Sequence, residues 1–394
     1  MTVRYLHVLH SLNPEHGGPP HGVKQLASAA IRLQQEVEVV TLDGPANPWQ
    51  RDWPCPVHSL GPGALRYGYT PRYAPWLRAN LARFDAVVVN GLWQYHGLAT
   101  WRILRQSTVP YYVFTHGMLD PWFKRRYPLK HLKKLLYWPW AEYRVLRDAH
   151  GVLFTSEEER LLARQSFAHY RAREIVLNYG TPGLSGDAQA QRSLFLQRFP
   201  HLRGKRCFLF LSRIHPKKGC DLLIEAFAPL LRADPALQLV IAGPDQSGLQ
   251  PQLERRAQRL GVSQSITWTG WLNDEVKVGA FRAAEAFVLP SHQENFGMVV
   301  AEALSAQLPV LISNKVNIWR EIAADEAGLV AEDTLQGTRQ MLQQWLALSD
   351  EERRAKARAA GECFRQRFHL DSGACNILQL FAQHASKPEQ SCAA

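Results

Sequence analysis

Short apolar segments alternate with helical segments along almost the whole chain, and this order constrains the fold more than any other feature. The apolar segments predict strands at residues 3–9, 37–41, 86–89, 111–115, 151–155, 174–177, 207–212, 237–242, 266–269, 286–289, 310–313 and 328–331. Helical segments such as 22–35 and 156–167 lie between them. This alternation is typical of α/β proteins, in which helices cover both faces of parallel sheets. So many strands are unusual in one sheet, which predicts two sheets.

The chain of 394 residues is long enough for two domains of ordinary size. A stretch rich in turn residues ends at Gly183, polar residues follow it, and the next predicted strand begins only at Cys207. We therefore expect one domain over residues 1–183 and a second over 184–367. We also expect a terminal helix over 368–385 and a disordered tail over 386–394.

The composition is that of a soluble globular protein, with 46% hydrophobic and 21% charged residues. No apolar run is long enough to cross a bilayer, and the first ten residues indicate a strand rather than a signal peptide. Six scattered cysteines without a C-x-x-C pair favour reduced thiols in the cytosol. The net charge of +11 indicates an acidic partner, which composition leaves open among nucleic acid, an anionic membrane surface and a phosphorylated substrate.

The segment from Ala286 to Ser305 carries the most specific pattern in the sequence. A buried strand leads into a polar loop that contains Glu294 and Gly297, and a helix begins near Met298 with Glu302 about one turn inside it. The free N–H groups of that first turn are a ready anion site, which we expect between the two carboxylates. Such a site suits a ligand with hydroxyls on both sides of its phosphates, which is the layout of a nucleotide-sugar.

Two other loops follow predicted strands and carry ligand-binding residue types. Arg213 and Lys218 lie on a basic loop where paired cations can neutralise a diphosphate; the alternative is a solvated basic loop. Gly17 and Gly18 lie between the first strand and the first helix, where glycine lets the backbone approach a ligand; the alternative is an ordinary flexible loop. The G-x-G-x-x-G fingerprint is absent, which argues against a standard NAD-binding domain.

Three further residues follow strands in the first half. His116 and Asp120 come just after the strand at 111–115, and ligands of open α/β sheets bind at the carboxyl ends of strands. The alternative is that both residues cap a local turn. Trp93 is a candidate for stacking on a sugar ring, although a core position is the preferred interpretation.

The segment from Trp122 to Trp140 interleaves lysines and arginines with aromatic and leucine side chains. The spacing of Leu129, Leu132 and Leu136 predicts a helix, with Lys130, Lys133 and Lys134 among these leucines. This composition fits a helix that lies in a membrane interface. It fits equally well a helix with one face in the protein core and a solvated basic face. A nucleic-acid role is disfavoured because no known nucleic-acid module is found.

In these motifs the chain resembles the retaining GT-B glycosyltransferases of family 4 (group 1), of the bacterial polysaccharide-biosynthesis type. The resemblance rests on the E-x7-E run at Glu294 and Glu302, the R-x4-K-G spacing at Arg213 and Lys218, and the His-Gly pair at His116. It implies two Rossmann-like domains facing a central cleft, with a C-terminal helix that crosses back to the first domain.

The resemblance also implies roles for individual residues. Glu294 would hold sugar hydroxyls, Glu302 the ribose hydroxyls, and His116 would contact the transferred sugar. The implied catalytic residues are His116, Glu294, Arg213 and Lys218. The implied substrate-binding residues are Gly17, Gly18, Gly243, Asn295, Phe296, Gly297, Met298, Val299 and Glu302, and the candidates for the acceptor side are Asp120 and Trp93.

The expected donor is a UDP- or GDP-sugar, and the expected acceptor is a lipid-linked glycan or an oligosaccharide. No cofactor is expected, and no metal either, because no D-x-D motif occurs. The expected location is the cytoplasm, peripheral on the inner face of the cell membrane, with no nucleic-acid partner. Two alternatives remain: a nucleotide-sugar epimerase or hydrolase of the same fold, and a basic nucleic-acid-binding protein.

Overall fold

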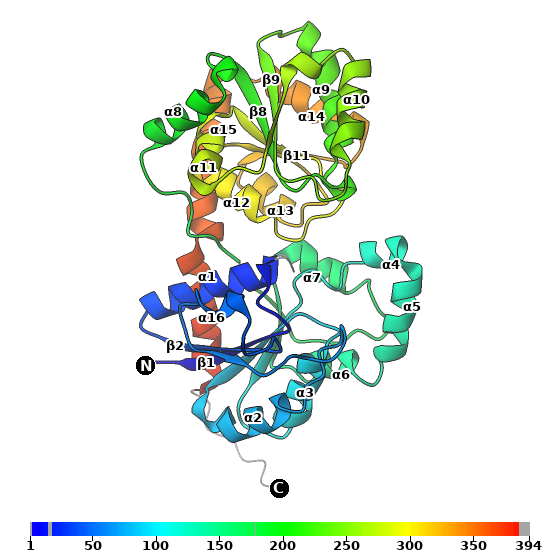
Figure 1. Cartoon of the computed structure of the whole chain (residues 1–394), viewed down its shortest axis with the longest axis vertical. Helices are drawn as coiled ribbons and strands as arrows, with labels where there is room; N and C mark the ends of the chain where they lie inside the picture. Colours follow the sequence, from blue (N-terminus) through cyan, green and yellow to red (C-terminus); the bar gives the residue numbers. More distant parts are fainter. Residues whose placement is uncertain (1, 15–17, 178, 386–394) are drawn as a thin grey trace. The chain divides into compact units, whose positions relative to one another are not determined.

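The computed structural model describes residues 2–14, 18–177 and 179–385 (Figure 1). Two compact units make up this structure. Unit 1 consists of the chain up to Pro182 together with the chain from Leu370 onward, and unit 2 of Gly183–His369. The observed divisions therefore lie one residue before the expected boundary at 183 and two residues after the expected boundary at 367. The tail expected at 386–394 lies outside the described residues.

Unit 1 is built on a parallel sheet in the order β3-β2-β1-β4-β5-β6-β7. Most of its strands are buried along their length, as expected for a sheet covered on both faces. The strands are β1 (Arg4–Leu9), β2 (Glu36–Thr41), β3 (Val57–Ser59), β4 (Ala86–Asn90), β5 (Tyr111–Phe114), β6 (Gly151–Phe154) and β7 (Glu174–Val176). The helices include α1 (Gly18–Arg32), α2 (Tyr73–Asn80), α3 (Tyr95–Leu104), α4 (Trp122–Arg126), α5 (Pro128–Tyr137), α6 (Glu142–Arg147), α7 (Glu157–Ala163) and α16 (Leu370–Ala385).

Two details of unit 1 differ from the sequence expectation. Strand β3 was not predicted, because it has only three half-buried residues at the sheet edge and follows Pro56. Helix α1 begins at Gly18 and not at Gly22, because Pro19 and Pro20 fall in its first turn. Proline is tolerated there, since the N–H groups of a first turn have no partner within the helix.

Unit 2 is built on a second parallel sheet in the order β10-β9-β8-β11-β12-β13. In each unit the strand order reverses beside the unit's first strand, and such a reversal point is where open α/β sheets bind ligands. The strands are β8 (Arg206–Leu211), β9 (Leu237–Ala242), β10 (Ile266–Gly270), β11 (Ala286–Leu289), β12 (Val310–Ser313) and β13 (Gly328–Ala331). The helices include α8 (Ala188–Arg198), α9 (Cys220–Phe227), α10 (Gln250–Arg259), α11 (Asp274–Ala283), α12 (Met298–Ser305), α13 (Trp319–Ala324), α14 (Leu335–Ala347) and α15 (Asp350–Cys363).

The terminal helix α16 packs on unit 1, as the sequence predicts (Figure 1). The Phe381 ring lies 5.1 Å from the ring of Tyr5 on β1 and 5.1 Å from that of Tyr112 on β5. Arg32 at the end of α1 forms a salt bridge of 2.6 Å with Asp371. Helix α16, the last helix of the described residues, therefore contributes to the hydrophobic core of unit 1.

Among the described residues, no helix combines the length and apolar character needed to cross a membrane. The cysteines in the described ranges are all free thiols, and these are Cys55, Cys207, Cys220, Cys363 and Cys375. Packing and hydrogen bonds, not disulfides, therefore hold this part of the chain together.

Candidate active site

Lys218 and Glu294 meet at the carboxyl end of the sheet in unit 2. Lys218 lies on the loop after β8 and Glu294 on the loop after β11, and these strands are neighbours. The Lys218 Nζ donates to Glu294 Oε2, and Lys218 is only 8% exposed. The Nζ of Lys217 lies 3.3 Å from Gln293 Oε1, and the His292 N–H donates to the Lys217 carbonyl at 2.7 Å. The two loops are thus joined by both side-chain and backbone hydrogen bonds.

Glycine is required at two positions behind this pair. Gly219 has a φ of +68°, and a Cβ there would lie 2.2 Å from the Pro290 carbonyl oxygen. Gly243 has a φ of +132°, and a Cβ there would lie 2.0 Å from the Ser212 carbonyl oxygen. Only glycine fits such close backbone approaches without strain. Gly243, predicted to lie near a ligand, therefore already has a role in joining the ends of β8 and β9.

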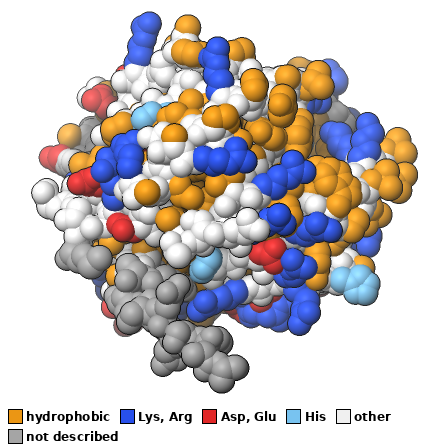
Figure 2. All heavy atoms as spheres, turned by 90° about the horizontal axis from the view of Figure 1, so that it is seen from below, with side chains coloured by type: hydrophobic (Ala, Val, Ile, Leu, Met, Phe, Trp, Pro, Cys, Tyr) orange, Lys and Arg blue, Asp and Glu red, His pale blue; other side chains and the backbone are white. Residues whose placement is uncertain are grey.

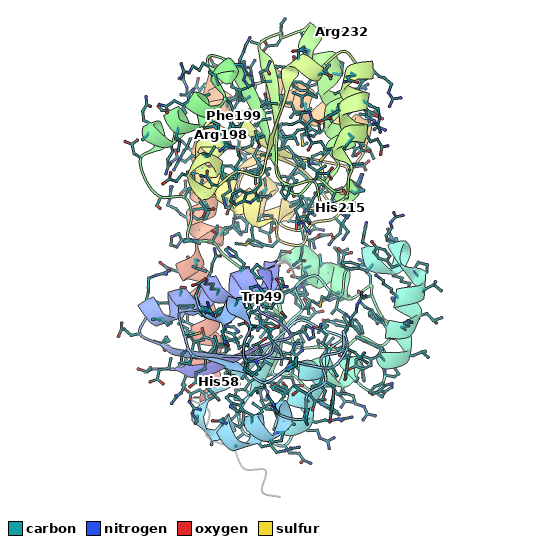
Figure 3. All side chains as sticks on the ribbon, viewed as in Figure 1. Trp49, His58, Arg198, Phe199, His215 and Arg232 are labelled. Atoms are coloured by element: carbon teal, nitrogen blue, oxygen red, sulfur yellow. The ribbon has the colours of Figure 1, made fainter. Side chains whose placement is uncertain are left out.

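Arg213 lies on the same basic loop but remains exposed, with Nη1 3.2 Å from Gln246 Oε1. His215, labelled in Figure 3, accepts the Lys217 N–H through Nδ1 at 3.1 Å and shapes the short turn before Lys218. Burial and then the neighbouring cations lower the pKa of His215. The loop thus presents one exposed guanidinium and one buried ammonium.

Glu302 lies in α12, whose N-cap residue is Gly297 (φ +73°), a residue without a side chain to cap the helix start. The Oε1 atom of Glu302 accepts from Lys277 Nζ of α11 at 3.1 Å. Its Oε2 atom is buried and has no hydrogen-bond partner within the described part of the chain. A buried carboxylate oxygen without a donor costs free energy, so a ligand hydroxyl placed there would be favourable. Lys277 was missed because no spacing in the sequence links α11 to Glu302.

The rest of the loop before α12 is held by its own contacts. The Asn295 Oδ1 atom accepts from Asn317 Nδ2 at 3.2 Å, and the buried Phe296 ring meets the Phe368 ring edge-on at 5.7 Å. The contacts of these two side chains therefore help to shape the loop. The helix start itself is formed by Gly297 and by two half-buried residues, Met298 and Val299.

His116 lies just after β5 in unit 1, with a positive φ of 48°. Its Nε2 atom is 3.2 Å from Oδ1 of Asn90, at the end of the neighbouring strand β4. The Asn90 Nδ2 atom lies 3.1 Å from the Val88 carbonyl oxygen and 3.4 Å from that of Val8. The carbonyl oxygens of Val88 and Val8 can only accept hydrogen bonds. The atom of the Asn90 amide that faces them is therefore the donor Nδ2, and Oδ1 is the acceptor that faces His116. His116 therefore carries its proton on Nε2, which leaves Nδ1 as an acceptor.

Desolvation lowers the pKa of His116 to about 4, so its ring is neutral near pH 7. The turn that carries His116 is held by Glu159 of α7, whose side chain is buried. Glu159 Oε1 accepts from the Gly117 N–H and from Thr115 Oγ1, both at 2.6 Å, and Oε2 accepts twice from Thr155 at 2.7 Å. Glu159 was missed by the sequence reasoning. The available signal was the Ser-x-x-Glu pattern at the start of its helix, which indicates a cap.

A cavity of about 540 Å³ opens in unit 1 at the ends of β1 and β4. Gly18, the first residue of α1, lies beside cavity-lining Pro19, and a Cβ added to it would meet nothing within 4 Å. Gly17 lies outside the described residues. Because Asn90 lines the cavity and also contacts His116, the histidine is coupled to the cavity wall. The polar lining includes His10, Ser11, Arg66, Asn90 and Gln94.

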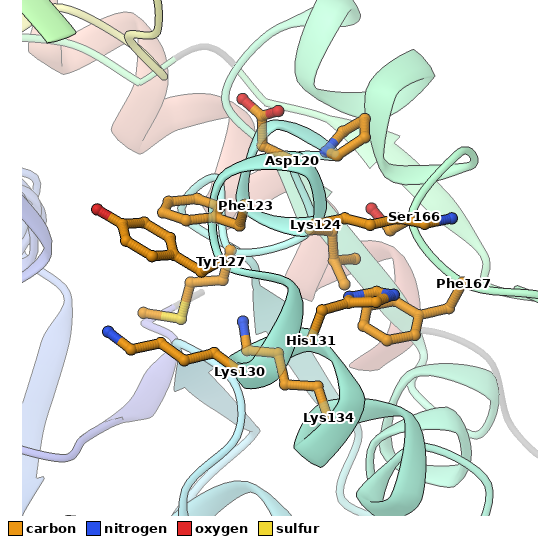
Figure 4. A pocket seen from close by; sticks show the side chains of 12 residues that line it. Asp120, Phe123, Lys124, Tyr127, Lys130, His131, Lys134, Ser166 and Phe167 are labelled. Carbon is orange, nitrogen blue, oxygen red and sulfur yellow. The ribbon is translucent and has the colours of Figure 1, made fainter.

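The two candidates for the acceptor side have local partners. The Trp93 ring lies 5.2 Å from that of Phe167 and 6.2 Å from that of Trp138, in an aromatic cluster of the unit 1 core. This is the core position preferred from the sequence. The Asp120 Oδ1 atom accepts from the Trp122 N–H at 2.8 Å, as a turn residue does. Asp120 also lines a small cavity of about 60 Å³ beneath α4 and α5 (Figure 4).

Comparison with known families and proteins places the chain among glycosyltransferases. The family model described as "Glycosyl transferase 4-like domain" matches residues 17–180, and the one described as "Glycosyl transferases group 1" matches residues 194–362. A D-inositol 3-phosphate glycosyltransferase from Geodermatophilus obscurus is 30% identical over 204 residues, which cover 49% of this chain and 44% of that protein. The chain thus matches less than half the length of this curated relative.

Solved structures extend the similarity of the fold over nearly the whole chain. A sucrose-phosphate synthase from Thermosynechococcus elongatus superposes with a TM-score of 0.74 at 20% identity, covering 96% of this chain and 98% of that one. The Anabaena protein HepE, in complex with UDP and glucose, superposes with a TM-score of 0.73 at 17% identity, covering 96% and 99%. At these identities the likeness establishes the two-domain GT-B fold.

Proposed function

Because the chain belongs to the group 1 glycosyltransferase family, we propose that it moves a sugar from a nucleoside-diphosphate sugar to an acceptor hydroxyl, with retention of anomeric configuration. The observation that carries the proposal is the joining of Lys218 and Glu294 where the strand order of unit 2 reverses. Breaking the anomeric bond leaves negative charge on the diphosphate and positive charge on the sugar. The cations Arg213 and Lys218 and the start of α12 would stabilise the diphosphate, while Glu294 would hold sugar hydroxyls.

The nucleotide end of the donor is assigned to Glu302. Its buried Oε2 atom lacks a donor among the described residues, and a ribose hydroxyl would supply one. Lys277 holds the other carboxylate oxygen and so fixes the direction of the first. We propose a UDP- or GDP-sugar as donor; the UDP and glucose named for the HepE complex support the former.

The acceptor is assigned to unit 1. The polar cavity at the ends of β1 and β4 offers hydrogen-bonding groups for a glycan, and neutral His116 offers Nδ1 to a sugar hydroxyl. We propose that the acceptor is a lipid-linked glycan or an oligosaccharide of bacterial surface polysaccharide synthesis, and that the enzyme works in the cytoplasm. In a front-face reaction the departing phosphate oxygen would take the proton of the acceptor hydroxyl as the new glycosidic bond forms.

Binding of nucleotides to matched variants tests the donor site. UDP, GDP and their sugars would be screened by thermal shift, and the best ligand measured by calorimetry. Losing hydrogen bonds to a charged group weakens binding by roughly 10- to 100-fold, so this loss is expected for Glu302→Ala. Glu332→Ala, an exposed glutamate of the same unit, is the control and should bind normally. Equal affinity of both variants, or no binding of any nucleotide, would refute the assignment.

Product analysis tests the reaction itself. Proton NMR of the product should show the same anomeric configuration as the donor, and activity should persist in EDTA, because the proposal assigns the neutralising charge to Arg213 and Lys218. Free sugar or an isomerised nucleotide-sugar as the sole product would favour the hydrolase or epimerase alternative.

A further inference from the structure

Helix α5 of unit 1 exposes its leucines. It has no buried residue, and Leu129, Leu132 and Leu136 are 79%, 56% and 70% exposed. These three residues and exposed Lys133 lie on one side of the helix, at the spacing of a single helical face. We call this set the leucine face. Large apolar side chains at such exposure indicate a surface that binds something apolar.

Three polar side chains of α5, those of Lys130, His131 and Lys134, lie on the side of the helix away from the leucine face. The ammonium group of Lys134 lies 4.4 Å above the Trp93 ring, and that of Lys130 lies 4.8 Å from the Tyr127 ring. The His131 ring packs against Phe167 at 4.9 Å. Figure 4 shows Lys130 and Lys134 extending in the same direction from α5. In an ordinary surface helix the apolar side chains pack inward and the charged ones face solvent. Helix α5 has its leucines outside instead, so the alternative interpretation, a helix with its apolar face in the protein core, is wrong.

The surroundings of the leucine face are strongly basic. Residues 121–141 contain six lysines and arginines and no aspartate or glutamate. Tyr127 and Trp140 are 38% and 48% exposed next to these charges, as aromatic residues are at headgroup depth in membranes. Figure 2 shows hydrophobic side chains gathered beside lysines and arginines on the right of one face. A second copy of the chain would bring the same six charges against these, so self-association through this face is electrostatically unfavourable.

We propose that α4 and α5 dock on an anionic lipid surface, with the leucine face inserted at the boundary between headgroups and acyl chains. The flanking cations would then lie at the depth of the lipid phosphates, where each basic residue strengthens binding about fivefold. The exposed cations available for this contact are Lys133 on the leucine face and Lys124, Arg125 and Arg126 on α4.

The helices that carry the leucine face and its flanking cations, α4 and α5, lie next to the proposed acceptor site. Met118 lines both the small cavity beneath α4 and α5 and the 540 Å³ cavity at the ends of β1 and β4. A docked unit 1 would therefore hold the larger cavity close to the bilayer, where a lipid-linked acceptor has a short path into it. This consequence rests on the proposed function, whereas lipid binding itself does not.

Vesicle flotation with the full chain tests the proposal. The wild-type protein should float with vesicles of phosphatidylcholine and phosphatidylglycerol, bind pure phosphatidylcholine at least tenfold more weakly, and lose affinity as salt rises. The variant Leu129→Ser/Leu132→Ser/Leu136→Ser should bind the anionic vesicles at least about 50-fold more weakly. Its thermal stability should be unchanged, because α5 buries none of its residues.

A matched variant controls for general loss of surface leucine. Ile31→Ser/Leu194→Ser/Leu260→Ser removes three side chains that are 36%, 37% and 42% exposed elsewhere, and it should bind vesicles like the wild type. Equal loss in both variants, or equal binding of neutral and anionic vesicles, would overturn the proposal. So would a wild-type dimer by light scattering that the α5 variant converts to monomer, because the face would then be a subunit interface. Failure of lipid binding would leave the nucleotide tests of the proposed function unaffected.

Discussion

Replacing Lys218 with methionine separates the structural role of the Lys218–Glu294 pair from its role in chemistry. Methionine keeps an unbranched, flexible and apolar stem of nearly the same length but lacks the ammonium group. The paired side chains are 10% and 21% exposed, so the pair is mostly but not fully removed from water. A hydrogen bond to a charged group contributes about 1.5–3 kcal/mol. Because Glu294 can partly rehydrate, we expect the lower value, which lowers the Tm of a unit of this size by about 3–6 °C.

The expected effect on turnover is larger. Lys218 is proposed to stabilise the departing diphosphate, and removal of one such electrostatic group costs roughly 100- to 1,000-fold in rate. Adding Glu294→Gln to Lys218→Met replaces the orphaned carboxylate by a neutral amide. The double variant should therefore recover most of the lost Tm without recovering turnover. Differential scanning fluorimetry and a transfer assay with one fixed donor and acceptor measure both quantities.

Lys217→Met is the matched control for Lys218→Met. Lys217 lies next to Lys218 in the chain, and its ammonium contacts the neutral Gln293 side chain at 3.3 Å. This variant should lose less than about 1 kcal/mol and stay within roughly threefold of wild-type turnover. If the double variant regains turnover together with stability, neither the Lys218 ammonium nor the Glu294 carboxylate is needed for the chemistry. Normal turnover of Lys218→Met alone would remove the lysine from the mechanism.

Three further outcomes are expected. Lys277→Ala should weaken nucleotide binding several-fold in calorimetry, because Glu302 loses the 3.1 Å contact that orients it; unchanged affinity would contradict this role. Asn90→Asp should raise the pKa of His116 from about 4 by roughly one unit or more and move the acid limb of the kcat/KM profile upward, whereas an unmoved limb would contradict a role for neutral His116 in the reaction. Burial lowers the pKa of His96 to about 4 from 6.5 in the unfolded chain. The unfolded state then binds more protons than the folded state below pH 6.5, so stability falls as the pH drops from 6.5 to 4. Between pH 7.5 and 5, the free energy of unfolding of His96→Gln should therefore fall by roughly 2 kcal/mol less than that of the wild type, as measured by chemical denaturation.

Local patterns in the sequence predicted the parts of this protein that depend on local physics. The alternation of apolar and helical segments predicted the parallel sheets, because strand and helix periodicities are properties of neighbouring residues. The loops of Arg213, Lys218 and Glu294 were found for a similar reason, since they directly follow buried strands. The short edge strand β3 was missed, because three half-buried residues carry too weak a pattern.

The pairing of the candidate site residues was decided by the tertiary structure. Lys218 meets Glu294 only because β8 and β11 are neighbours in the sheet, and Lys277 meets Glu302 only because α11 and α12 pack in one unit. Glu159 holds the His116 turn across a similar distance in sequence. The sequence likewise did not determine whether the leucines of α5 point outward or into the core, because leucines have the same spacing on a core face and on a membrane face. Periodicity shows that a helix has an apolar side, but what packs against the helix determines whether that side is buried.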